Sequence, residues 1–203
     1  MLDVARILTL PKLRRQRMGS VESCIQHRRS VRSFRDEALT FEEFGQLLWA
    51  TQGLTDVDGK RSAPSAGALY PLETSVAVGN VAGVDAGVYR YSVPRHALVP
   101  VTLGDQRKQL VEAADDQEWI ATASAVVCIA ALFARTTGKY GDRGRGYVFM
   151  EAGLAAASMM LQAVGLGLGA TMIGAFNDDA VARVLHLAAG ELPLCLIPVG
   201  RPC

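Results

Sequence analysis

Hydrophobic positions recur at helical spacing in several segments of the chain. The clearest helix is predicted between Thr40 and Gly53. Its apolar stripe consists of Phe41, Phe44, Leu47 and Leu48. Thr40 and Glu43 have the spacing of a capping box, and Gly53 is a typical C-terminal stop.

The same reasoning predicts five further helices and six strands. The helices are expected at 20–26, 105–114, 116–122, about 145–164, and 178–187 after an Asn177 cap. The strands are expected at 73–79, 87–93, 96–101, 123–133, 169–176 and 192–200. Residues 87–101 are expected to form a hairpin, and Pro198 is expected to interrupt the last strand. Helices and strands alternate irregularly, which indicates an α+β fold with a mixed sheet.

Two glycine-containing segments resemble known motifs. The sequence GLGLGA at 165–170 fits the letters of a dinucleotide fingerprint, but it ends a helix and enters a strand, the reverse of the order that such a site requires. The sequence APSAGALYP at 63–71 lacks the first glycine of a nucleophile elbow. Its small residues between two prolines would let the backbone approach a flat ligand, although an ordinary surface loop remains the alternative.

Length and composition fit a single domain over residues 1–203, with 1–19 as an N-terminal extension. The four cysteines and three histidines lack metal-type spacing, so no metal site is expected, and reduced thiols in a cytoplasmic protein are the simplest interpretation. Residues 147–176 carry Glu151 as their single charge. Their many glycines and alanines favour a buried helix followed by a buried strand over a membrane span.

Charge is unevenly distributed along the chain. Residues 1–35 contain nine Lys or Arg and two acidic residues, although the net charge is +1. Within HRRSVRSF at 27–34, Arg28 and Arg32 share a face if the segment is helical, and Arg28, Ser30 and Arg32 do so if it is extended. Either arrangement suits a phosphate monoester better than a nucleic acid, which would need a larger patch with aromatic residues. A solvated basic face remains the alternative.

Five segments of the chain occur in the order seen in one enzyme family. They are RRSVRSF, LLWATQGLT, APSAGALYPLE, the long segment from KYGDRGRGY to GATMIGAF, and LPLCLIPVGRP. Together they resemble the FMN-dependent nitroreductases, and within them the SagB-type dehydrogenases, which include azoline oxidases. The resemblance covers residues 20–202. It implies an α+β nitroreductase-like fold with a mixed, mainly antiparallel sheet flanked by helices, an intertwined homodimer, and one FMN at each subunit interface.

The resemblance also assigns cofactor-binding residues. Those matched to the phosphate and ribityl contacts are Arg28, Arg29, Ser30 and Arg32, with Arg201 as a further phosphate ligand. Those matched to a loop on the isoalloxazine of the partner subunit are Pro64, Ser65, Ala66 and Gly67, whose backbone donors would stabilise charge on the reduced ring. Those matched to a flavin-facing turn are Gly174 and Ala175.

Some positions depart from the common nitroreductases. Gly67-Ala68 and Gly174 stand where an Asn and a Glu are usual, as in the SagB-type branch. Lys139 and Tyr140 match a Lys-Tyr pair proposed to act in azoline oxidation, with an exposed lysine in a glycine-rich loop as the alternative.

The function expected from the resemblance is an FMN-dependent oxidoreductase that transfers hydride through flavin N5 in a ping-pong cycle, with NAD(P)H as a candidate donor. A second interpretation is an azoline-to-azole oxidase acting in peptide modification. A flavin store and a non-catalytic anion- or nucleic-acid-binding module are alternatives of other classes. The expected partners are a second copy of the chain and a small-molecule or peptide-derived substrate, without nucleic acid or membrane.

Overall fold

The structure is a computed structural model that describes residues 6–13 and 19–203. Its centre is a seven-stranded antiparallel sheet in the order β1-β4-β3-β2-β5-β7-β6. The strands are β1 (Leu8–Thr9), β2 (Leu72–Val78), β3 (Gly87–Ser92), β4 (Ala97–Leu103), β5 (Ala125–Ala131), β6 (Gly169–Ala170) and β7 (Leu192–Gly200). Central strand β5 is buried along its whole length, as its continuous apolar sequence predicts.

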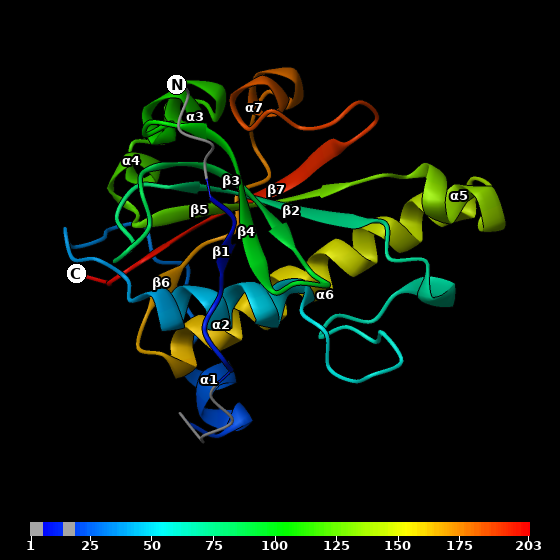
Figure 1. The fold of residues 1–203 in the computed structure, drawn as a ribbon, viewed down its shortest axis with the longest axis horizontal. Coiled ribbons are helices and arrows are strands. Elements are labelled where there is room, and N and C mark those ends of the chain that lie inside the picture. Colours follow the sequence, from blue (N-terminus) through cyan, green and yellow to red (C-terminus); the bar gives the residue numbers. More distant parts are fainter. Residues whose placement is uncertain (1–5, 14–18) are drawn as a thin grey trace.

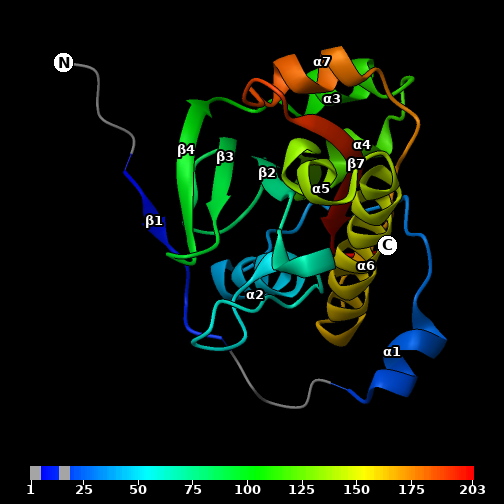
Figure 2. The ribbon, with the colours of Figure 1, turned by 90° about the vertical axis from the view of Figure 1, so that its right-hand side faces the viewer.

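Helices cover both faces of the sheet (Figures 1 and 2). One face carries α2 (Phe41–Gln52) and α6 (Arg143–Gly165), and the other carries α3 (Arg107–Ala113), α4 (Trp119–Thr122) and α7 (Asp178–Val184). The remaining helices are α1 (Val21–His27), α5 (Ala134–Tyr140) and the short 3-10 turn η1 (Ala66–Ala68). Two apolar clusters therefore sandwich the sheet, which confirms the α+β prediction.

Helix α6 lies under the sheet and contacts α2, β5 and β7. Its length and composition would allow it to cross a membrane, and it is the one helix among the described residues of which this is true. Its buried side consists mainly of small or unbranched residues, such as Ala152, Ala155, Ala156 and Met159. These residues allow a close approach to the sheet, as expected for the core helix that the sequence predicted.

Most predicted boundaries agree with the structure, and the caps agree in detail. Ser20 Oγ accepts from the Ser23 amide, and Asn177 Oδ1 accepts from the Ala180 amide. The Thr40–Glu43 capping box is complete, and the hairpin of β3 and β4 is present. The segment 165–170 ends α6 and enters β6, as predicted.

Three expectations were wrong. The sheet is antiparallel rather than mixed between its named strands, and parallel pairing is confined to single bridges such as Ser30 with Ala170. Pro198 does not interrupt β7, because its carbonyl still accepts from the Thr171 amide. Residues 169–176 form a strand only at β6, after which Ile173 alone pairs with Leu196.

Helix α5 was not predicted, and the glycine-rich loop given as the alternative setting for Lys139 is wrong. Gly138 lies within the helix, and Gly141 follows its end with φ 56°. The N-terminal extension also adds an unpredicted strand, β1, which pairs with β4, and Leu10 is buried beside it. Residues 1–5 and 14–18 of that extension lie outside the described residues.

The capping box of α2 gives a direct test of the fold. Replacing Thr40 with Ala removes the Oγ1 acceptor that lies 3.2 Å from the Glu43 amide. We expect the free energy of unfolding, measured in urea, to fall by about 1 kcal/mol. The matched control is Glu42→Ala, also in the first turn, which should cost no more than about 0.5 kcal/mol. Equal losses in the two variants would contradict the cap assignment.

Candidate functional site

The arginine segment (residues 28–32) follows α1 and is fixed against the edge of the sheet. The Arg28 amide closes α1 by donating to the Cys24 carbonyl at 3.0 Å. The chain then runs beside β6, where Val31 N donates to Ala170 O at 3.1 Å. A Cβ on Gly169 would lie only 2.7 Å from Val31 Cγ1, so this approach requires glycine at 169. The extended geometry is the second of the two arrangements that the sequence analysis considered.

The three arginines of this segment have no acidic partner within 4 Å among the described residues. Arg29 donates to the backbone carbonyls of Gln26 and Arg28 and lines a small cavity of about 320 Å³ with His27 and Leu168. The Arg32 guanidinium lies 5.8 Å from the ring centre of Trp119. The arginine segment is therefore a local excess of positive charge that is suited to an anion.

Helix α4 links the arginine segment to the turn at Gly174 and Ala175. Gln117, just before α4, donates from Nε2 to the Ala175 carbonyl at 3.1 Å. Trp119 Nε1 is buried and has no hydrogen-bond acceptor among the residues described. Buried N–H groups normally have a partner, so an acceptor atom of a ligand beside Arg32 would satisfy this one. Gln117 and Trp119 were not predicted as site residues, because no pattern in the sequence indicates that α4 lies beside the arginines.

Arg201, the further phosphate ligand expected from the resemblance, is paired with acidic side chains in this structure. Its guanidinium makes a bidentate pair with Glu43 at 2.9 and 2.8 Å and also approaches Glu37 at 3.3 Å. Glu43 is the residue that completes the capping box of α2. In this structure Arg201 thus joins the end of β7 to the start of α2, and its charge is already balanced.

The flavin-type loop predicted at 64–67 is held rigidly by its own bonds and by α6. Ser65 Oγ accepts from the Tyr70 amide at 2.8 Å. The Ala66 amide donates to Glu151 Oε1 at 2.8 Å, and Glu151 is only 5% exposed. Gly67 has φ 62°, a conformation that favours glycine. Glu151 was visible in the sequence as the single charge of a long apolar segment, which was the signal for its role.

Arginine side chains support the far end of the same loop. The Arg61 guanidinium stacks over the Tyr70 ring at 4.5 Å, and Arg135 donates to the Tyr70 carbonyl at 2.9 Å. Arg135 also pairs with Glu73 at 2.7 Å. Burial lowers the pKa of Arg61, but an arginine starts so high that it remains charged near neutral pH.

Lys139 and Tyr140 lie directly against this loop. A Cβ on Gly67 would fall 2.7 Å from Tyr140 Oη and 3.0 Å from Lys139 Nζ. The two side chains come from the end of α5, whose first residues follow β5 closely. The structure thus brings together two groups of residues, 64–67 and 139–140, that are more than seventy positions apart in the sequence.

The loop and the arginine segment are not brought together within one chain. The loop contacts α6 at Glu151, whereas the cavity beside Arg29 includes Val164 of the same helix. Thirteen residues of helix correspond to about 20 Å. Figure 1 shows the same separation, with α1 near one end of α6 and α5 near the other. The predicted site residues therefore form two half-sites in this structure.

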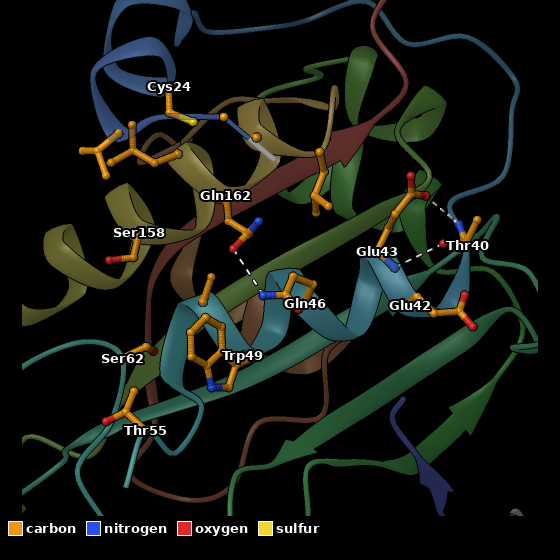
Figure 3. A pocket seen from close by; sticks show the side chains of 16 residues that line it. Cys24, Thr40, Glu42, Glu43, Gln46, Trp49, Thr55, Ser62, Ser158 and Gln162 are labelled. Atoms are coloured by element: carbon orange, nitrogen blue, oxygen red, sulfur yellow. Dashed lines mark hydrogen bonds between the residues drawn. The ribbon is translucent and has the colours of Figure 1, made fainter. Parts of the chain in front are cut away.

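A larger cleft of about 590 Å³ lies between α1, α2 and α6 (Figure 3). Trp49 and Ser158 are among its lining residues, and Gln46 donates to Gln162 across it at 3.4 Å. Its ionisable lining residues include the carboxylates Glu42 and Glu43. Glu43 is already paired with Arg201, and Glu42 would repel a phosphate, so the arginine segment is the better anion site.

Two of the four cysteines are buried and show no features of reactive thiols. All four are unpaired, and Cys128 and Cys195 are buried. Burial raises the pKa of Cys195 to about 12 and also raises that of Cys128. Since the thiolate is the nucleophile, neither side chain is suited to covalent catalysis.

Sequence comparison places the chain among known proteins. A family model described as the nitroreductase family matches residues 25–201. A Methanocaldococcus jannaschii protein, provisionally named a nitroreductase, is 44% identical over 89% of this chain and 90% of its own length. A Bacillus subtilis FMN reductase (NADPH) is 26% identical over 91% of this chain and 66% of its own length.

Structural comparison agrees with this placement. A Ralstonia eutropha protein, also provisionally named a nitroreductase, has TM-score 0.87 and 25% identity, covering 100% of this chain and 92% of that one. A chain in a structure of the E. coli microcin synthetase McbBCD complex has TM-score 0.74 and 26% identity, covering 84% of this chain and 67% of that one. The sequence match, its extent and the shared fold all point the same way: the chain belongs to the nitroreductase family.

Proposed function

We propose that the protein is an FMN-dependent oxidoreductase that works as a homodimer. The observation that carries the proposal is the arginine segment beside β6. Among the described residues its three arginines have no acidic partner, and the neighbouring Trp119 Nε1 has no acceptor. These residues fit a phosphate-bearing group, and the nitroreductase family gives a flavin as that group. The likeness to an FMN reductase supports the same choice.

The chain's own residues would bind and orient the cofactor. Arg28 and Arg32 would neutralise the phosphate, and Ser30 would contact the ribityl chain. Gly174 and Ala175 are exposed, and an added Cβ on Gly174 meets nothing within 4 Å, which leaves space for a flat ring there. When bound, FMN would accept a hydride at N5 from a donor such as NAD(P)H and return it to an acceptor.

The 64–67 loop would supply the opposite wall of the site from the second subunit. The Ala66 amide already donates to Glu151, so it is not available to the flavin, contrary to the expectation that the whole loop offers backbone donors. The loop would instead contribute a rigid surface at Gly67, where its backbone can approach the flavin closely. Tyr140 and Lys139 stand behind that surface.

The exposed face of α6 supports the homodimer. Phe149, Met150 and Leu154 are 54%, 60% and 48% exposed on a helix that otherwise packs in the core. Val21 and Ile25 of α1 are also exposed. Covering these side chains with a second copy would remove apolar surface from water and bring one subunit's loop to the other's arginine segment.

A second candidate function is azoline oxidation. The position of Lys139 beside Gly67 favours it, because oxidation of an azoline needs a base to remove a proton as hydride leaves to the flavin. The likeness to a chain of a microcin synthetase complex supports this candidate too. Reduction of nitroaromatics or quinones requires no such base. Lys139→Ala should therefore impair azoline oxidation and not these reductions, which separates the two uses of the site.

The FMN assignment predicts a yellow protein whose affinity depends on the arginine segment. Replacing Arg28 and Arg32 with Ala should weaken FMN binding by about 2–5 kcal/mol, because two charge-assisted contacts are lost. The measurement is fluorescence titration of the apoprotein with FMN. The matched control is Arg95→Ala, an exposed arginine distant in the sequence, which should leave FMN affinity unchanged. A colourless protein that does not bind added FMN would refute the proposal.

Glu151 is predicted to hold the loop through its bond to the Ala66 amide. Glu151→Ala removes the acceptor and should lower the free energy of unfolding by about 1–3 kcal/mol, because a part-buried N–H loses its partner. Glu151→Gln keeps a carbonyl oxygen in place and should stay within about 1 kcal/mol of the unmodified protein. Urea unfolding and limited proteolysis of the loop are the measurements. If Gln destabilises as much as Ala, the bond to Ala66 is not what holds the loop.

A further inference from the structure

Beyond Gly67, side chains from α5 and the start of α6 alternate between cations and aromatic rings. We call Lys139, Tyr140, Tyr147 and Arg143 the cation–aromatic row. Lys139 Nζ lies 5.3 Å from the Tyr140 ring centre, and the Tyr140 and Tyr147 rings meet edge to face at 5.2 Å. The Arg143 guanidinium lies 5.7 Å from the Tyr147 ring centre. The row is therefore continuous from one cation to the other.

The charges of the row are not balanced by nearby acids. Residues 134–147 contain four basic residues and one acid, Asp142. Arg135 pairs with Glu73, but neither Lys139 nor Arg143 has an ion-pair partner within 4 Å in the part of the chain that the structure describes. Both cations are exposed, and both tyrosines are partly exposed. Each cation is held beside a ring, which limits its freedom to turn away.

The row also begins at the proposed active site. Tyr140 Oη and Lys139 Nζ are the atoms nearest to a Cβ placed on Gly67, the part of the loop assigned to the flavin. At the other end of the row, Arg143 contacts the second ring, Tyr147, which in turn contacts Tyr140. A molecule seated on the tyrosines would thus have one end near the flavin and the other near Arg143.

From this arrangement we infer that the row is a substrate subsite for planar aromatic molecules that carry an anionic group such as a carboxylate. The tyrosine rings would contact the aromatic ring of the substrate, and Arg143 would pair with its anion. Arg143 is then the residue that determines the preference for anionic over neutral substrates. The inference rests on the proposed flavin-dependent function, and it adds the class of substrate.

The test compares 4-nitrobenzoate with 4-nitrobenzamide, two nitroaromatics of the same shape that differ in charge. We expect kcat/KM of the FMN-loaded protein to be higher for the anion, and Arg143→Gln to lower the ratio of the two kcat/KM values roughly fivefold, as for one partly exposed ion pair. Arg143→Glu should lower the ratio further. Arg95→Gln, a charge change outside the site, should not alter it.

A second measurement does not require turnover. Benzoate and benzamide are titrated against the protein by ligand-observed NMR, and Arg143→Gln should weaken only benzoate binding. If 4-nitrobenzamide is reduced but the ratio is unchanged in Arg143→Gln, the subsite inference is wrong and the flavin-dependent function stands. If the purified protein lacks flavin and reduces neither compound, the proposed function is wrong. Benzoate binding that is equal in the unmodified protein and in Arg143→Gln would also overturn the subsite.

Discussion

The length of α6 is the constraint on which the arrangement of the site depends. The helix runs beneath the sheet from Arg143 to Gly165 and contacts a different part of the site at each end. Glu151 in its first half accepts from the Ala66 amide and positions the loop, while Val164 near its C-terminal end lies beside the arginine segment. Because a helix cannot shorten, one chain holds the two half-sites about 20 Å apart. The proposed homodimer would bring the two halves together by taking one from each subunit.

Electrostatics distinguishes the two ends. At the arginine segment, no acidic side chain among the described residues pairs with the three arginines. The buried Trp119 Nε1–H beside them has no acceptor among these residues either. At the loop, the buried Glu151 carboxylate accepts a hydrogen bond from the Ala66 amide. The first end is suited to binding an anion, and the second to presenting a rigid surface. Arg201 lies near the first end, since its carbonyl accepts from the Arg35 amide, but Glu43 and Glu37 already neutralise its side chain.

Local signals in the sequence predicted much of the fold. The caps at Ser20, Thr40 and Asn177 depend on residues three positions apart, and they were found correctly. The α5 helix was missed because glycine lowers helix propensity, and here packing against α6 outweighs that local preference. The prediction that Pro198 interrupts the last strand was wrong. Proline lacks one backbone N–H donor, and this loss does not end a strand whose other hydrogen bonds are kept.

Less of the site than of the fold could be predicted from the sequence. The basic segment at 28–32 and the Pro-Ser loop were recognisable from their composition, and the resemblance supplied roles for them that stay proposals. Their neighbours could not be predicted, because contacts such as Ala66 with Glu151 or Arg32 with Trp119 join residues about 85 positions apart. Such contacts depend on the packing of the whole chain rather than on any local pattern.

The most direct test of the shared site is subunit complementation. One variant carries Arg28→Ala and Arg32→Ala; the other carries Gly67→Val, which cannot easily adopt φ 62° and would collide with Tyr140. Nitroaromatic reduction is measured in each parent and in mixed dimers purified through two different tags. In a mixed dimer, one site receives both defects and the other receives none. We expect inactive parents and a mixed dimer with about half the turnover of the unmodified dimer. A mixed dimer no more active than its parents would contradict the shared site.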